Sequence, residues 1–462
     1  MPGRAGSHVL GWLMAVPSKP TPEPLRQLFA LIDKLRHATT GSAGRRAVTA
    51  NSGWLLFDKL TRSLLGLLVG AWVARHLGPT QFGLLAYVLA FIALFQAIAN
   101  LGADAIIVRD IAQHPDSAPE ILGTALGLRA GFGVLCWAVA VGCVAALNAD
   151  APRTILMAAI VGSVLVFQAS DTVDLWFQSQ SRSRLTVFAK LSAYLLSNGI
   201  KVGLILCDAP LEAFAAVTAF DALACTAGLF MAYRRMRTPQ RWRFVLPRAT
   251  RLAGEAWPFM LSGVSIMVYA RIDQIMIKEI LGDHSLGIYA AALPLSQFWQ
   301  VIPLTLATSL APFIARRKIA DERDYQRSLV LVFRAFFYMG VGCAAFTWLV
   351  SGILVIHLFG PAFAEATHTL NVHAISNVFC FLGVAHGLWL VNERRFAVRL
   401  YGTLLAGLTT IAMNMLLLPR LGTVGAAYAA IAAQFVAAVL INLFLDPRSF
   451  RMQCDAIFFR KV

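Results

Sequence analysis

The sequence predicts an all-α membrane protein with twelve transmembrane helices. Composition is the first reason: 58% of the 462 residues are hydrophobic, 14% are charged and the mean hydropathy is +0.67, values outside those of soluble globular proteins. Spacing is the second, because twelve apolar runs long enough to cross a bilayer follow one another. The third is that basic residues gather in alternate separators between those runs.

Each apolar run is assigned to a span by its length. The first contains 24 residues from Trp54 to Leu77, and about 20 predominantly apolar residues suffice for a helix to cross a bilayer. The twelve runs cover approximately residues 51–76, 83–108, 121–147, 154–178, 185–206, 211–233, 253–280, 286–314, 329–357, 366–391, 396–418 and 423–445.

Residues 1–50 precede the first run and are predicted to form a cytoplasmic extension. Within it, residues 25–38 place Leu25, Leu28 and Leu31 on one helical face, which is the pattern of an amphipathic helix lying in the membrane interface. An extension without regular structure is the equal alternative.

The distribution of basic residues predicts the sidedness of the spans. Thirty of the forty Lys and Arg residues lie in the two tails, in the separators before runs 3, 5, 7, 9 and 11, or just inside the runs that follow these separators, as Lys190 and Arg399 do. The opposite separators hold or adjoin only Arg75, Arg153 and Arg420. Because basic segments flanking a span remain in the cytoplasm, both termini are predicted to be cytoplasmic.

The largest basic separator, residues 234–252, divides the spans into two halves at 51–233 and 253–445, followed by a cytoplasmic tail at 446–462. Six spans in each half give both halves the same orientation, which predicts a pseudo-two-fold axis along the membrane normal. We call these ranges the first half and the second half.

A short repeat agrees with this division. Gly78 and Gly282 close the first span of each half, and Gly83 and Gly287 follow five residues later. Internal similarity at matching places is the sequence pattern of a duplicated unit.

Five stretches carry a family resemblance that extends over most of residues 51–445. They are ARHLGPTQFGLLAY (74–87), WPFMLSGVSIMVYARIDQIMI (257–277), LGIYAAALPLSQFWQVIP (286–303), LFGPAF (358–363) and LGTVGAAYAA (421–430). In this order they resemble the polysaccharide-biosynthesis flippases, the Wzx-type transporters of the multidrug/oligosaccharidyl-lipid/polysaccharide (MOP) superfamily. The extension at 1–50 departs from the pattern, as does the absence of a thirteenth and fourteenth span.

The resemblance implies a flippase that moves an undecaprenyl-diphosphate-linked oligosaccharide, a repeat unit of O-antigen, capsule or exopolysaccharide, across the bacterial inner membrane by alternating access. It also implies contact with membrane lipid, and with a polysaccharide polymerase and other assembly proteins as partners. No cofactor is expected; an H⁺ or Na⁺ gradient is the expected source of energy.

Four basic side chains lie deep in predicted spans: Lys59, Arg62, Lys201 and Arg271. A charge at the bilayer centre costs roughly 2.5–3.5 kcal/mol, so these side chains are expected to face the protein interior. One interpretation is structural ion pairing, as the i, i+4 spacing of Asp58 and Arg62 suggests. The other is a cationic cavity that binds a diphosphate, with Arg62 the first candidate and Arg271 the second.

Three further basic residues, Arg129, Lys278 and Arg334, are expected to anchor span ends at the membrane interface.

Acidic residues inside the spans are candidates for ion coupling. Gln168, Asp171, Asp174 and Gln178 recur at three- and four-residue steps, which places them along one side of the fourth span. Asp171 and Asp174 either bind a cation or proton or pair with a cavity arginine, and the sequence leaves both open.

Four other acids lie in spans. Asp58 and Asp273 are further coupling candidates, and Asp273 lies in RIDQIMI, where the resemblance also places an acid. Asp104 and Asp221 are interpreted as hydrogen-bonded structural acids.

Several function classes are disfavoured. No nucleotide-binding or hydrolytic motif is present, so no catalytic residue or enzyme activity is predicted. The seven cysteines form no CxxC and suggest no metal site, and the scattered basic residues do not indicate nucleic-acid binding. A multidrug antiporter of the same superfamily is the first alternative, although it would favour an acidic cavity. A membrane-bound polysaccharide polymerase or ligase is the second, although no long outward loop is present.

Overall fold

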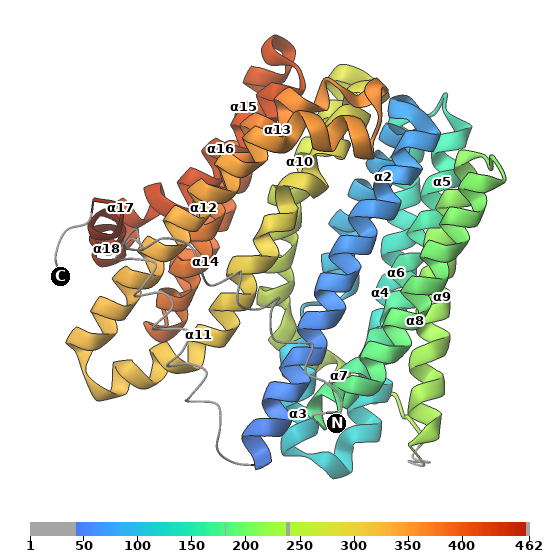
Figure 1. Ribbon diagram of the computed structural model, residues 1–462. Helices are drawn as coiled ribbons and strands as arrows, with labels where there is room; N and C mark the ends of the chain where they lie inside the picture. The colour runs from blue at the N-terminus through green and yellow to red at the C-terminus, as the bar shows by residue number, and fades with distance from the viewer. Residues whose placement is uncertain (1–42, 181, 237–240, 459–462) are drawn as a thin grey trace, which may run out of the picture. The chain divides into compact units, whose positions relative to one another are not determined.

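The computed structural model describes residues 43–180, 182–236 and 241–458 (Figure 1). The predicted amphipathic helix at 25–38 and the last residues of the tail lie outside these ranges. The chain divides into two compact units, residues 1–50 and 51–462. Every regular element in the described ranges is a helix.

The first half of the chain forms helices that pack on one another. α8 packs on α9, α4 packs on α5 and α6, and α3 packs on α7 (cyan and green in Figure 1). The bounds are α2 Ala43–Ala99, α3 Asp104–Gln113, α4 Ala118–Leu147, α5 Pro152–Gly162, α6 Val164–Phe167, α7 Asp171–Ser179, α8 Ser183–Leu206 and α9 Leu211–Arg235.

The second half is also helical. α10 packs on α15 and α13, α12 packs on α14, and α15 packs on α16. The bounds are α10 Leu246–Gln297, α11 Val301–Ala320, α12 Glu322–Leu358, α13 Ala366–Ala374, α14 Ser376–Asn392, α15 Phe396–Leu421, α16 Thr423–Phe435, α17 Ile441–Leu445 and α18 Pro447–Ile457, with a π-helical segment at Val436–Leu440.

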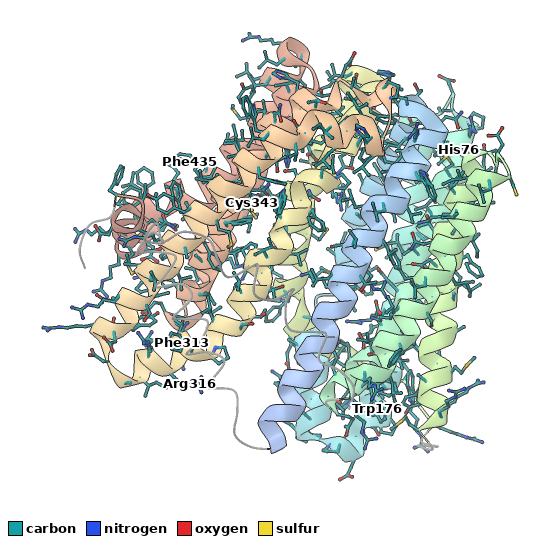
Figure 2. All side chains as sticks on the ribbon, viewed as in Figure 1. His76, Trp176, Phe313, Arg316, Cys343 and Phe435 are labelled. Atoms are coloured by element: carbon teal, nitrogen blue, oxygen red, sulfur yellow. The ribbon has the colours of Figure 1, made fainter. Side chains whose placement is uncertain are left out.

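Nine helical stretches in the described ranges are long and apolar enough to cross a membrane. Two of them, residues 59–113 and 246–320, each contain two of the predicted runs, and the remaining run at 185–206 forms α8. The all-α, multi-pass fold is therefore confirmed, whereas the count of twelve crossings stays a prediction. Figure 2 places Arg316, from a predicted cytoplasmic separator, and His76, beside a predicted outward one, at opposite ends of the bundle.

Glycines produce the sharp bends in the two longest helices. Gly78 has φ 71° and ψ 169°, and Gly282 has φ 85° and ψ 175°. Only glycine adopts such a backbone without strain, so both helices turn there. The nearly equal angles agree with the repeat predicted from the sequence.

Next to these bends, the two halves cross backbone to backbone. A Cβ atom on Gly83 would lie 1.8 Å from the Asp283 carbonyl oxygen, and one on Gly287 would lie 1.9 Å from the Pro79 carbonyl oxygen. The contact is reciprocal, as a two-fold relation between the halves would produce. We call residues 78–87 and 282–289 the glycine crossing; the pseudo-two-fold axis for the remaining chain stays a prediction.

Apolar side chains from both halves surround this crossing. Leu77, Tyr87 and Phe214 from the first half share one buried cluster with Ile277 and Leu286 from the second. The halves are therefore held together here by burial as well as by close backbone approach.

Candidate functional site

Helix α8 presents a polar face to the interior of the first half. Lys190, Tyr194, Ser197 and Lys201 follow one another at steps of four, three and four residues, so they share one side of the helix. Each has a partner or charged neighbour on another helix, as described below. This face was only partly predicted, because Lys190 was counted with the basic separator before the span and not among the charges inside it.

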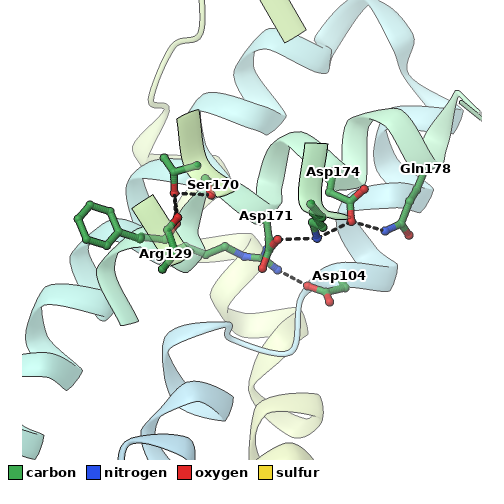
Figure 3. A network of polar contacts seen from close by, with 10 residues as sticks. Asp104, Arg129, Ser170, Asp171, Asp174 and Gln178 are labelled. Atoms are coloured by element: carbon green, nitrogen blue, oxygen red, sulfur yellow. Dashed lines mark hydrogen bonds and ion pairs between the residues drawn. The ribbon is translucent and has the colours of Figure 1, made fainter. Parts of the chain in front are cut away.

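Lys190 lies between the two acids of α7. Its Nζ is 2.7 Å from Asp171 Oδ1 and 2.9 Å from Asp174 Oδ2, and the Gln178 amide donates to Asp174 at 3.1 Å (Figure 3). The predicted polar side of the fourth span is present, and the basic partner of its acids is this lysine. The ammonium offsets the repulsion between two carboxylates one helical turn apart.

Arg62 on α2 lies against the same face of α8. Its guanidinium carbon is 4.9 Å from the centre of the Tyr194 ring, and the Tyr194 hydroxyl donates to the Arg62 carbonyl at 3.0 Å. Gly66 permits this approach, since a Cβ there would lie 2.8 Å from the Tyr194 hydroxyl. The Asp58 side chain lies outside the described residues, and Lys59 is exposed.

The outward part of the polar face holds Lys201. Asp221 on α9 accepts a hydrogen bond of 2.8 Å from Ser197, which agrees with its interpretation as a hydrogen-bonded acid, and its charge acts on the half-buried Lys201. Arg62, Lys190 and Asp221 thus all lie on the polar face of α8 or contact residues of it. These groups therefore belong to one cluster.

Arg129 on α4 extends the cluster toward α3. Its side chain is only 1% exposed and pairs with Asp104, so the prediction that it anchors at the interface is wrong. The cause is tertiary packing: α3 folds back and supplies a carboxylate 25 residues earlier in the chain. In Figure 3 the Arg129 side chain reaches toward Asp104 and Asp171.

Lys278 connects the two halves. Its side chain is 13% exposed, and Nζ donates to Asn148 at the end of α4, pairs with Glu279 at 3.2 Å and lies 4.3 Å from the centre of the Tyr87 ring. Its anchoring at the membrane interface stays a prediction.

The basic residues of the first half are matched by acids. We define the charged cluster as four basic and four acidic side chains, Arg62, Arg129, Lys190, Lys201, Asp104, Asp171, Asp174 and Asp221. With every acid ionised its net charge is zero. Of the cationic groups predicted for a diphosphate, Arg62 and Lys201 belong to this cluster, and Lys201 lies near the Asp221 carboxylate, which competes for it.

The interior of the second half is different. Asp273 is buried and accepts hydrogen bonds from the Tyr289 hydroxyl and, at 2.8 Å, from the Gln274 backbone N–H. Arg271 is half-buried, and no contact in the described ranges brings it to the charged cluster. Another buried polar contact in this interior joins His373 Nδ1 to Ser296 Oγ at 2.8 Å.

A buried acid at the end of the second half has a structural role. Asp446 accepts hydrogen bonds from the Trp389 indole at 2.6 Å and from Arg395 at 3.1 Å, and it joins α14 to the start of α18. Burial alone would raise its pKa, but His386, Trp389 and Arg395 outweigh burial and hold the pKa below its ordinary value.

Solved structures show which class of protein has this fold. The chain is similar to a multidrug-resistance MATE transporter of the MOP superfamily, with a TM-score of 0.68 and 14% identity over 87% of this chain and 96% of that one. It is similar to the lipid II flippase MurJ, with a TM-score of 0.61 and 11% identity over 87% and 90%. It is also similar to a MOP superfamily transporter from Pyrococcus furiosus, with a TM-score of 0.62 and 15% identity over 94% of this chain and 100% of that one.

The family follows from the sequence match. A family model described as polysaccharide biosynthesis protein matches residues 48–318, more than half of the chain, and the chain therefore belongs to that family. This confirms the resemblance found in the sequence. The family and the solved neighbours are transporters and flippases, not enzymes. No curated protein sequence matches the chain.

Proposed function

We propose that this protein is a flippase that moves an undecaprenyl-diphosphate-linked oligosaccharide from the cytoplasmic to the outer leaflet of the bacterial inner membrane. The family match carries the proposal, because it links the chain to polysaccharide biosynthesis, and the MOP fold supplies a transporter. The repeat unit's sugar would remain in the aqueous interior while the polyprenyl chain stays in lipid.

The charged cluster supports an anionic headgroup. The Arg62 guanidinium lies over the Tyr194 ring and its planar shape suits phosphate oxygens, while Lys190 and Lys201 lie on the same face of α8. A multidrug antiporter is the second candidate, favoured by the MATE fold and by the acids Asp171 and Asp174. The lysine between those acids counts against it, since a cationic drug would meet an ammonium there.

Reconstitution separates the two candidates. Proteoliposomes carrying the lipid-linked oligosaccharide should show glycan reaching the opposite leaflet, read by a membrane-impermeant glycosidase, and they should not accumulate ethidium. Arg62→Ala should reduce flipping by more than about tenfold, and Arg62→Lys should restore it only in part because a point charge lacks the bidentate geometry. Arg420→Ala, at an exposed position in a predicted outward separator, is the matched control. Ethidium transport without glycan flipping would contradict the proposal.

A further inference from the structure

The site between Asp171 and Asp174 already contains a cation, the ammonium of Lys190. Both carboxylates contact the same Nζ, at 2.7 and 2.9 Å. A transported Na⁺ that used these two carboxylates would first have to displace a covalently attached cation. The predicted coupling site is thus occupied by the chain itself.

Two observations indicate that this ion pair does more than hold α7 to α8. First, the Lys190 side chain is 25% exposed and that of Asp171 is 40% exposed, so a ligand can reach them. Second, Arg129 points toward the same network from a position that is 1% exposed, and its Nε has no hydrogen-bond partner among the described residues. A buried guanidinium N–H without a partner costs free energy, which an anionic ligand would recover.

We propose that Lys190 is a built-in counter-cation that exchanges the Asp171 and Asp174 carboxylates for the diphosphate of the cargo. The inference rests on the proposed flippase function and names a recognition residue for it. In the exchange, contacts from Nζ to carboxylate oxygens are replaced by contacts from Nζ to phosphate oxygens, and no covalent bond changes. Arg129, which points toward Asp171, keeps a positive charge near this acid when Lys190 leaves, and this lowers the electrostatic cost of the exchange.

The proposal makes the two acids competitors of the cargo. Neutralising them should therefore strengthen diphosphate binding, whereas removing the ammonium should weaken it. A purely structural ion pair would instead give changes in the same direction from both sides, because breaking it from either side removes the same contact.

Binding to the full-length protein in nanodiscs tests this. The probes are undecaprenyl diphosphate, undecaprenyl phosphate and undecaprenol, and the readout is the dissociation constant from intrinsic tryptophan fluorescence. Lys190→Gln should weaken diphosphate binding by about tenfold or more, as expected for loss of a charge-assisted contact, and Lys190→Arg should retain most of it. Asp171→Asn/Asp174→Asn should tighten it several-fold.

Asp221→Asn is the comparison for net charge. It removes one negative charge from the same cluster, but its partner is Ser197 and not Lys190, so its effect should be smaller than that of the double variant. The Tm of each variant shows that the fold is kept, and Lys190→Arg preserves the ion pair if Lys190→Gln does not fold. Replacing K⁺ by Na⁺ at constant ionic strength should leave the dissociation constant unchanged.

The outcomes separate this inference from the proposed function. Equal binding of undecaprenol and undecaprenyl diphosphate to the wild type would contradict the flippase proposal itself. A wild-type preference for diphosphate that survives in Lys190→Gln would overturn the role of Lys190 alone. Weaker binding in the Asp171→Asn/Asp174→Asn variant, or tighter binding specifically in Na⁺, would also overturn it.

Discussion

The two ends of α4 are contacted by different parts of the chain in and just before α10, and different kinds of contact hold them. Near the start of α4, residues 241–256, which we call the docked segment, are bound through the backbone: Arg243 N–H donates to the Pro119 carbonyl at 3.2 Å and Val245 N–H donates to Thr124 Oγ1 at 3.1 Å. At the other end of α4, Lys278 contacts Asn148 through side chains alone, beside the glycine crossing.

The docked segment also buries apolar side chains. Leu252 and Ala256 of the docked segment are buried in an apolar cluster formed with α3 and α4 of the first half. A Cβ on Gly123 would lie 2.5 Å from the Arg243 backbone, so the segment lies as close to α4 as backbone permits. The docked segment is therefore packed as a part of the first half, although residues 241–252 belong to the loop predicted to divide the halves and residues 253–256 to the predicted second half.

Pro258 lies in α10 between these two contacts. Proline lacks the N–H that would bond to the carbonyl four residues earlier, which makes it the weakest point of the helix for bending. We expect the halves to separate at the glycine crossing while the docked segment stays on the first half, with α10 bending near Pro258. Alternating access would then break the outward contact and keep the cytoplasmic one.

The largest effect is expected from cross-linking the two ends separately. Cysteines replacing Asn148 and Lys278, joined by a bifunctional methanethiosulfonate, should abolish glycan flipping, because the outward end can no longer open. Cysteines replacing Glu120 and Arg248, whose side chains are 3.5 Å apart, should leave flipping close to the uncross-linked rate. Flipping is measured in proteoliposomes before and after reduction.

Each pair is its own control, since a reductant releases the cross-link without changing the sequence. Loss of flipping by both pairs would mean that the docked segment also moves, and the rigid boundary would return to residues 234–252. Retention of flipping by the Asn148/Lys278 pair would show that the outward contact does not open.

The second-largest effect on flipping is expected at the glycine crossing. Gly83→Ala should reduce flipping by more than about tenfold while membrane abundance stays within about twofold, because the added Cβ would lie 1.8 Å from the Asp283 carbonyl and the closed outward contact would not form. Gly70→Ala on the same helix has no atom within 4 Å of its Cβ and should flip normally. Wild-type flipping by Gly83→Ala would show that the crossing is dispensable.

The same comparison shows what the sequence could predict. The bends at Gly78 and Gly282 are local, because a positive φ combined with an extended ψ is a backbone conformation that only glycine adopts readily, and the glycine is visible in the sequence. Apolar run length likewise predicted the helices. The reciprocal contact of Gly83 with Asp283 was not predictable, since it depends on how the two bent helices meet.

The candidate site was predicted less completely for a similar reason. Asp171, Asp174 and Arg62 were recognised as buried charges, but their partners depend on neighbouring helices. Lys190 lies near the start of α8 and was counted with the basic residues of the separator before that span. Its four-residue spacing from Tyr194 nevertheless indicated that the two side chains share a face of the helix. Arg129 was treated as an interface residue because its burial comes from α3.

The smallest effect is expected at the exposed ion pairs of the docked segment. Glu255 accepts from Arg109 and from Arg251, both at 2.9 Å, but the arginine side chains are 47% and 76% exposed. Exposed ion pairs contribute little because water and salt screen them. Glu255→Gln should therefore change flipping by less than about twofold.

Burial of apolar side chains, in contrast, should decide whether the docked segment stays attached to the first half. Leu252 is 7% exposed, and Leu252→Asn would place an amide in an apolar cluster at a cost of about 1–3 kcal/mol. An added cysteine at Ala249, which is 3% exposed, reports detachment through its labelling by maleimide in inside-out vesicles. Labelling should rise in Leu252→Asn and stay at the parent rate in Glu255→Gln, even in 1 M salt. Faster labelling in Glu255→Gln alone would show that ion pairs, and not apolar packing, hold the docked segment to the first half.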